Sequence, residues 1–132
     1  DKMDRVVKIT RLNDNVVLET RTYDAAGNLK TVTDALNHTT TYSYDALGNL
    51  TQIVNPDGSA TQYAYDKLGR IVSTTDALGN TTAYTYDANG NQTSATDAEG
   101  NITVYTYDSV RNVTSVTTYN SEFRINPAVP LR

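Results

Sequence analysis

A 21-residue period constrains what this chain can fold into. The dipeptide Tyr-Asp recurs five times at this interval, usually with a second tyrosine two places earlier and a glycine three places after the aspartate. Strict periods of about 20–50 residues are typical of stacked supersecondary units, so we interpret the chain as a repeat array. The structural repeat residues are Tyr23, Asp24, Gly27, Tyr42, Tyr44, Asp45, Gly48, Tyr63, Tyr65, Asp66, Gly69, Tyr84, Tyr86, Asp87, Gly90, Tyr105, Tyr107 and Asp108.

A second turn motif lies midway between the Tyr-Asp pairs, at residues 34–37, 55–58, 76–79 and 97–100. Residues 1–7 align with residues 66–72, so six periods are visible and the first begins at its turn. We expect residues 1–118 to form the array, as a segment of a longer protein. The period breaks in residues 119–132, for which we predict an irregular tail, a linker or an end cap.

The segments between the turns have the composition of β-strands. Residues 60–65, 81–86 and 102–107 alternate with period two and are rich in Thr, Tyr and β-branched residues; we call these segments Tyr strands. The intervening segments, such as 50–54 and 71–75, are smaller and rich in Thr. No apolar stripe with helical spacing can be drawn. The sequence therefore predicts an all-β fold, an antiparallel meander of about twelve short strands.

Both turn motifs have the sequence pattern Asp-x-x-Gly, with substitutions at some positions. An aspartate at the first turn position accepts hydrogen bonds from the following backbone N–H groups, and a glycine three residues later suits a left-handed residue and a bulge. Asn37 and Arg111 stand at glycine positions and are therefore expected to be left-handed.

The tyrosines are expected to form a ladder on one face of the sheet. Tyr42 and Tyr44 are two residues apart and therefore point to the same side of a strand, as do the later pairs. A dozen strands would span roughly 55 Å. A sheet of that width does not stay flat, so we expect it to curve or spiral into part of a hollow shell.

Composition excludes several kinds of function. The net charge of −4 argues against nucleic acid and against anionic membranes. The absence of cysteine excludes disulfides and thiolate metal sites. No apolar run approaches the roughly 18 residues of a membrane helix, so we expect no membrane insertion. Only 38% of residues are hydrophobic, which is low for a domain with a thick core.

We predict no catalytic residue, no cofactor and no metal site. The aspartates recur at turn starts, where backbone hydrogen bonding explains them, whereas a catalytic carboxylate is expected to be singular. Calcium on the stacked turns is the sharper alternative, but the pattern matches neither known calcium repeat. His38, the only histidine, holds the place of Asn80 and Asn101 and is interpreted as a turn residue. The tyrosine ladder leaves sugar stacking open.

The repeat resembles the YD-repeat, or Rhs-repeat, family. The family pattern Tyr-x-Tyr-Asp-x-x-Gly-Arg/Asn-Leu reads here as residues 42–50 and 63–71. The relatives include bacterial Rhs and polymorphic toxins, Tc-toxin cocoon subunits, wall-associated proteins and teneurins. The resemblance implies a sheet that spirals into a hollow shell around a cargo polypeptide, or a large extracellular barrel. The arginine often found just before the family's Tyr-x-Tyr is absent, and neither a self-cleaving core nor a toxin domain is recognisable.

On this basis we expect a structural scaffold. The segment would belong to a YD/Rhs-repeat shell that encloses or displays a polypeptide toxin, secreted or at the cell surface of a bacterium. The expected partners are flanking YD repeats of the same protein and an enclosed toxin polypeptide. The alternative hypothesis is a cell-surface adhesion array that binds carbohydrate, with surface glycans as partners.

Overall fold

The computed structural model describes residues 5–122, which form eleven β-strands in one sheet and contain no helix. No helix that could cross a membrane therefore occurs in this range. The strands are β1 (Val6–Thr10), β2 (Val17–Tyr23), β3 (Leu29–Asp34), β4 (Thr39–Tyr44), β5 (Leu50–Val54), β6 (Ala60–Tyr65), β7 (Ile71–Thr75), β8 (Thr81–Tyr86), β9 (Gln92–Thr96), β10 (Ile102–Tyr107) and β11 (Val113–Tyr119).

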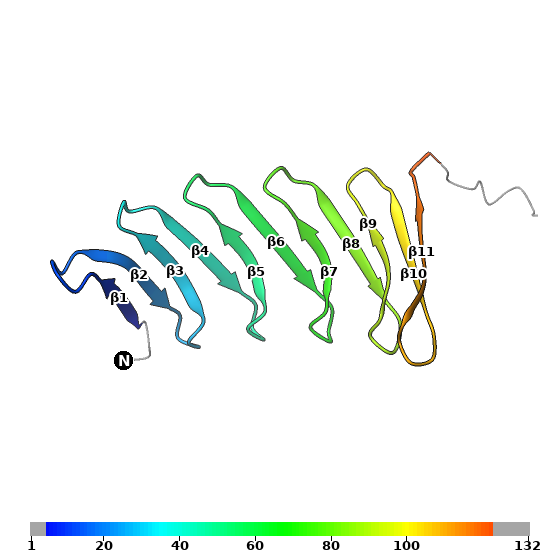
Figure 1. Cartoon of the computed structure of the whole chain (residues 1–132), viewed down its shortest axis with the longest axis horizontal. Coiled ribbons are helices and arrows are strands. Elements are labelled where there is room, and N and C mark those ends of the chain that lie inside the picture. Colours follow the sequence, from blue (N-terminus) through cyan, green and yellow to red (C-terminus); the bar gives the residue numbers. More distant parts are fainter. Residues whose placement is uncertain (1–4, 123–132) are drawn as a thin grey trace, which may run out of the picture.

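The strands lie in the sheet in their order along the chain, and every neighbouring pair is antiparallel (Figure 1). The predicted antiparallel meander is confirmed. The described range holds eleven strands rather than about twelve, because the first period begins at its turn and leaves no residues for a Tyr strand before β1. The even-numbered strands from β4 to β10 are the Tyr strands, and the odd-numbered strands are the short strands.

The two turn motifs lie at opposite edges of the sheet. The Tyr-Asp turns join each even-numbered strand to the next odd-numbered strand along the lower edge in Figure 1. The midway turns join odd-numbered to even-numbered strands along the upper edge. Each edge therefore carries one kind of turn, repeated at every second strand.

A bulge in each hairpin that is closed by a Tyr-Asp turn changes the phase of the short strand. Tyr44 is paired with Leu50, whereas the preceding Ser43 is paired with Gln52, which leaves Thr51 as an extra residue. Tyr42 is paired with Ile53. Because directly opposite residues share a face, Leu50 and Ile53 both face the tyrosines although they are three residues apart. The same shift recurs in the hairpins β2–β3, β6–β7, β8–β9 and β10–β11.

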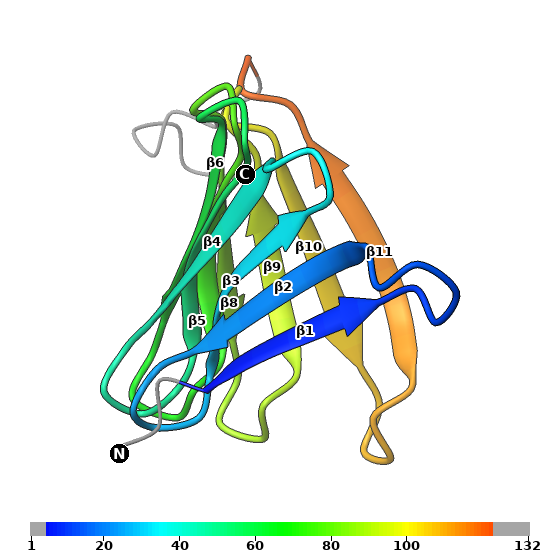
Figure 2. The ribbon, with the colours of Figure 1, turned by 90° about the vertical axis from the view of Figure 1, so that its left-hand side faces the viewer.

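The sheet is a single layer without an enclosed core. None of the residues 5–122 is fully buried, and most strand residues from β3 to β10 are half-buried. The chain exposes 9749 Å², whereas a globular protein of this mass exposes about 6,900 Å². The sheet curls instead of lying flat, as expected for its width (Figure 2). Stability therefore comes from contacts between neighbouring strands, as in other repeat proteins.

Candidate functional site

The aspartates organise the turns, as Asp45 illustrates. Its Oδ1 accepts hydrogen bonds from the backbone N–H groups of Leu47 and Asn49, both at 2.9 Å. Its Oδ2 accepts a third bond from the side-chain amide of Asn49, also at 2.9 Å. The backbone closes the turn, because Gly48 N–H donates to the Asp45 carbonyl at 3.1 Å. One carboxylate thus satisfies three donors of its own loop.

The same use of carboxylates extends along the chain. Every aspartate in residues 5–122 accepts at least one backbone N–H. The hydrogen bonds from Asn49 and the loop amides lower the pKa of Asp45, and equivalent bonds lower the pKa of the other repeat aspartates. Within the described range, no group of three or more His, Asp or Glu side chains could hold a metal ion.

The left-handed turn position is occupied as the sequence predicts. Gly27, Gly48, Gly69 and Gly90 have φ between 76° and 90°. Asn37 has φ 65° and Arg111 has φ 70°, which are left-handed values despite their side chains. Asparagine tolerates this conformation comparatively well, whereas arginine does so at a cost in free energy.

The tyrosines and the re-phased residues of the short strands make up one face of the sheet, which we call the tyrosine face. On this face, an open depression is lined by Ile71, Thr74, Tyr84, Tyr86 and Gln92. Both tyrosines of β8 thus lie on the same side of the sheet as Ile71 and Thr74 of the preceding short strand, β7. Burial raises the pKa of Tyr44 and of Tyr65, as expected for phenols that pack against neighbours.

The second tyrosine of a repeat makes a hydrogen bond to the preceding short strand. The Tyr65 hydroxyl donates to the Leu50 carbonyl at 2.8 Å. The paired ladder between β5 and β6 runs only from Val54 to Gln52, so this carbonyl lies beyond its end. Two further repeats have the same bond, from Tyr86 to Ile71 at 2.7 Å and from Tyr107 to Gln92 at 2.8 Å. In these three repeats the hydroxyl therefore links the repeat to the one before it.

Arg70 makes a second kind of link between repeats. It holds the turn position that asparagine holds at Asn49, and its Nε donates to Asp66 Oδ2 at 2.7 Å. Its Nη1 donates to the Asp87 carbonyl in the next Tyr-Asp turn at 3.2 Å. The guanidinium lies 4.7 Å from the centroid of the Tyr86 ring, within the range of a cation–π contact. Arg70 thus contacts two successive turns of one edge.

Charge is confined to the edges over most of the sheet. Strands β4 to β11 contain no Asp, Glu, Lys, Arg or His, so the charged side chains of this region lie in the turns. On the face opposite the tyrosines, threonine hydroxyls pair across neighbouring strands, as in Thr33 with Thr39 and Thr75 with Thr81, both at 2.8 Å. The strand residues on both faces of β4 to β11 are therefore uncharged and rich in hydroxyl groups, and the Arg70 guanidinium reaches the tyrosine face from its turn, over the Tyr86 ring.

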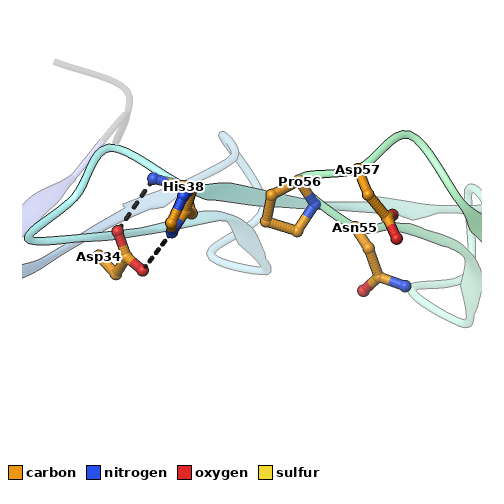
Figure 3. A pocket seen from close by; sticks show the side chains of 5 residues that line it. All are labelled: Asp34, His38, Asn55, Pro56 and Asp57. Atoms are coloured by element: carbon orange, nitrogen blue, oxygen red, sulfur yellow. Dashed lines mark hydrogen bonds and ion pairs between the residues drawn. The ribbon is translucent and has the colours of Figure 1, made fainter.

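His38 is a turn residue, as predicted. Its backbone N–H and its Nδ1 both bond to Asp34, at 2.9 and 3.0 Å, which reproduces the bonds of Asn80 to Asp76 (Figure 3). Between this turn and the next one along the edge lies an open depression of about 610 Å³, lined also by Asn55, Pro56 and Asp57. The imidazole bonds to Asp34 of its own turn, and these lining residues include no hydroxyl, thiol or amine side chain.

The fold and the surface define a class of protein. It is an all-β repeat array whose recurring aspartates and tyrosines form hydrogen bonds within the array itself. The RHS Repeat family matches the sequence four times in overlapping stretches, at residues 23–60, 44–81, 65–102 and 86–120. Together these matches cover well over half of the chain. The chain therefore belongs to the RHS Repeat family. No curated protein matches the sequence.

Solved structures with the same fold include those of Tc toxins. A pore structure of the Photorhabdus luminescens Tc holotoxin has a TM-score of 0.69 at 20% identity, over 88% of this chain and 6% of that one. The crystal structure of TcdB2-TccC3-Cdc42 has a TM-score of 0.68 at 21% identity, over 86% and 8%. The crystal structure of TcdB2-TccC3-TEV has a TM-score of 0.68 at 20% identity, over 82% of this chain and 6% of that one. The chain thus spans less than a tenth of each, and the likeness shows the fold.

The structure places the repeat residues in two settings, the tyrosines along one face and the aspartates and glycines along one edge. Sequence reasoning missed the re-phased short strand, the tyrosine-to-carbonyl bonds and the contacts of Arg70 with the next repeat. A signal for the first was present, since Leu29 and Val32, like Leu50 and Ile53, recur three residues apart. Such a spacing contradicts the period of two expected of a regular strand.

Proposed function

We propose that this chain is a wall segment of a YD/Rhs-repeat shell that encloses or displays a polypeptide toxin. The observation that carries the proposal is the continuous meander of identical hairpins, in which the recurring aspartates are used to build turns. Membership of the RHS Repeat family and the fold shared with Tc toxins support it. Its role would be containment, without catalysis or a cofactor, in a protein that bacteria secrete or display on the cell surface.

The uncharged faces fit this role. Whichever face of strands β4 to β11 turns inward, the strand residues themselves present hydroxyl, amide, aromatic and aliphatic groups without charge, and on the tyrosine face the Arg70 guanidinium covers the Tyr86 ring from its turn. Such a lining offers no strong electrostatic attraction to a polypeptide of either sign, so cargo would be held by enclosure. The partners we propose are flanking repeats of the same protein and an enclosed polypeptide.

The test is protection of cargo in the longer protein that contains this segment. We expect a protease-sensitive polypeptide carried by that protein to resist digestion. Ala83→Pro, in the middle of β8, removes a backbone donor from an interior strand and should expose the cargo. Ala88→Pro is the matched control, because it lies one residue after the turn aspartate, where proline is favoured and where Pro56 stands in another turn. Equal digestion of all three proteins would refute the proposal.

The carbohydrate-binding alternative has its own readout. Exposed tyrosines beside threonines could stack and hydrogen-bond sugars. Binding of the chain to defined structures on a glycan array, together with unprotected cargo, would favour an adhesion array over a shell wall.

A further inference from the structure

We propose that the turn between β8 and β9 is a site of spontaneous covalent modification, at which Asn89 is converted to aspartate and isoaspartate. Asn89 is followed by Gly90, and this Asn-Gly pair occurs once in the chain. The inference concerns the chemistry of one turn and holds whether or not the array encloses a cargo.

Asn89 departs from the repeat pattern. It is the third residue of its Tyr-Asp turn, directly before the left-handed glycine. The other four turns with a Tyr-Asp pair have apolar side chains at this place, namely Ala26, Leu47, Leu68 and Val110. Those side chains contain no electrophilic carbon, whereas the amide carbon of an asparagine is open to attack by the backbone nitrogen of the next residue.

The structure leaves the side-chain amide of Asn89 free. Asn89 is exposed, and its backbone N–H donates to Asp87 Oδ1 at 2.9 Å, but its side chain makes no hydrogen bond with residues 5–122. The asparagines at the fifth position of the turns differ, because the side-chain amide of each donates to the turn aspartate. They are Asn28, Asn49, Asn80, Asn91, Asn101 and Asn112. Asn89 thus combines a free amide with a following glycine.

The reaction needs only water and the groups of this turn. The backbone nitrogen of Gly90 loses its proton and attacks Cγ of Asn89, the bond from Cγ to the amide nitrogen breaks, and ammonia leaves. The product is a cyclic imide. Water opens this ring at Cγ to give aspartate, or at the backbone carbonyl to give isoaspartate. Glycine favours the attack, because it has no Cβ beside the attacking nitrogen.

The fold slows this reaction without preventing it. Gly90 N–H donates to the Asp87 carbonyl at 3.1 Å, and this bond must open before the nitrogen attacks. The same carbonyl also accepts Arg70 Nη1 at 3.2 Å, so two donors share it. Ala88, Asn89 and Gly90 are exposed, and a Cβ added to Gly90 would meet no atom within 4 Å, so the ring has room to close. Exposed turns are among the parts of a protein that open locally at the lowest free energy.

The two products should differ in their effect on the hairpin. Glu99 holds the equivalent place in a turn that also begins with an aspartate, Asp97, so an acidic side chain at position 89 is compatible with the turn. Isoaspartate instead lengthens the main chain by one methylene between Asp87 and Asn91. This insertion would break the bonds that close the turn and loosen the β8–β9 hairpin.

The test is incubation of the freshly purified, folded chain in mildly alkaline buffer, followed by digestion and tandem mass spectrometry. Asn89 should convert at least about tenfold faster than Asn37, which is exposed but precedes His38, and than Asn91, whose amide is held by Asp87. Methylation by an isoaspartyl methyltransferase identifies the isoaspartate.

Leu47→Asn is the matched variant that should gain a site. It places an Asn-Gly pair in a turn whose Gly48 N–H also donates to its aspartate carbonyl at 3.1 Å. The new asparagine should convert within about threefold of the rate of Asn89. Asn89→Leu, which restores the residue found at the same place in two other turns, should leave the chain without a fast site.

Three results would each overturn the inference. The first is conversion of Asn37 or Asn91 as fast as that of Asn89. The second is a folded chain in which Asn89 stays intact while a peptide of residues 85–95 converts completely. The third is a folded Leu47→Asn variant that gains no site. Cargo protection is measured separately, so this proposal and the proposed function can fail independently.

Discussion

Arg111 has a left-handed backbone conformation that is unfavourable for a residue with its side chain. It adopts φ 70°, at the position where four other repeats have glycine. Its side chain makes no hydrogen bond or ion pair with the residues that the structure describes, and its backbone N–H donates to Asp108 at 3.2 Å. Nothing in the described range therefore offsets the clash of a left-handed side chain with its backbone, which costs roughly 1 kcal/mol.

We predict that Arg111→Gly stabilises the protein. The substitution removes the left-handed clash but increases the freedom of the unfolded chain, so the net gain should be a few tenths to about 1 kcal/mol. The measurement is the free energy of unfolding from a urea titration. Gly90→Arg is the control, because its φ is 87° and an added Cβ would meet no atom within 4 Å. Gly90→Arg should lower the free energy of unfolding by a comparable amount. If Gly90→Arg had no effect and Arg111→Gly destabilised the protein, the assigned turn register would be wrong.

At the same scale, Tyr86→Phe should destabilise the sheet by about 0.5–1.5 kcal/mol. The substitution removes the bond to the Ile71 carbonyl at 2.7 Å but keeps the ring that lies under Arg70. Tyr84→Phe, whose hydroxyl has only a contact of 3.4 Å, should lose less. Equal losses in chemical denaturation would mean that the hydroxyl bond does not contribute measurably.

At the scale of the element, the hairpin turn makes stability depend on pH. The folded pKa of Asp45 lies below its ordinary value of 3.8, because Asn49 and the loop amides bond to the carboxylate. The stability contributed by such a group is complete above the ordinary pKa and disappears as the pH falls through the lowered folded value. The pKa values of the other turn aspartates are lowered in the same way, so their contributions to stability disappear over the same direction of pH change.

We therefore expect the melting temperature to be nearly constant from about pH 7 to pH 5 and to fall steeply below about pH 4. Asp45→Ala should lower the melting temperature at neutral pH and reduce the difference between neutral and acidic pH, since one titrating contributor is gone. Circular dichroism melts at both pH values measure this. A melting temperature that rises on acidification would show that charge repulsion along the edges outweighs the turn bonds.

Chelation of divalent cations should leave the hairpins unchanged. The turn carboxylates already accept backbone and side-chain donors, so they need no cation to be satisfied. The melting temperature with EGTA should equal that with added calcium. A large decrease in EGTA that calcium reverses would establish a metal site that the turn geometry does not explain.

At the scale of the whole molecule, the two ends of the sheet should be its least stable parts. Every residue of β1 and β11 is exposed, and each of these strands has one neighbour in the sheet. Unpaired strand edges also favour association with other chains. We expect backbone amides of the end strands to exchange faster than those of β5 to β8, and we expect the isolated chain to self-associate. A monodisperse monomer with uniform protection in hydrogen-exchange measurements would contradict this.

The sequence by itself determined the features that arise within a few residues. An aspartate and a left-handed residue three places later suffice for a Tyr-Asp turn, because the bonds of Asp45 all fall within its own five-residue loop. The Tyr strands β6, β8 and β10 lie where the period-two alternation predicted them, and the short strands β5 and β7 lie where the Thr-rich composition predicted them. The proposed roles of the repeat residues in the wall, and the boundary at residue 118, remain predictions.

The tertiary structure decided how one repeat meets the next. The bulge at Thr51 turns Leu50 toward the tyrosines, the Tyr65 hydroxyl reaches a carbonyl 15 residues back, and Arg70 reaches one 17 residues ahead. These contacts depend on how far neighbouring strands diverge at the end of their ladder. Twist and pairing register across the whole sheet determine that divergence, and the local spacing of Leu50 and Ile53 indicates only the change of phase within the short strand.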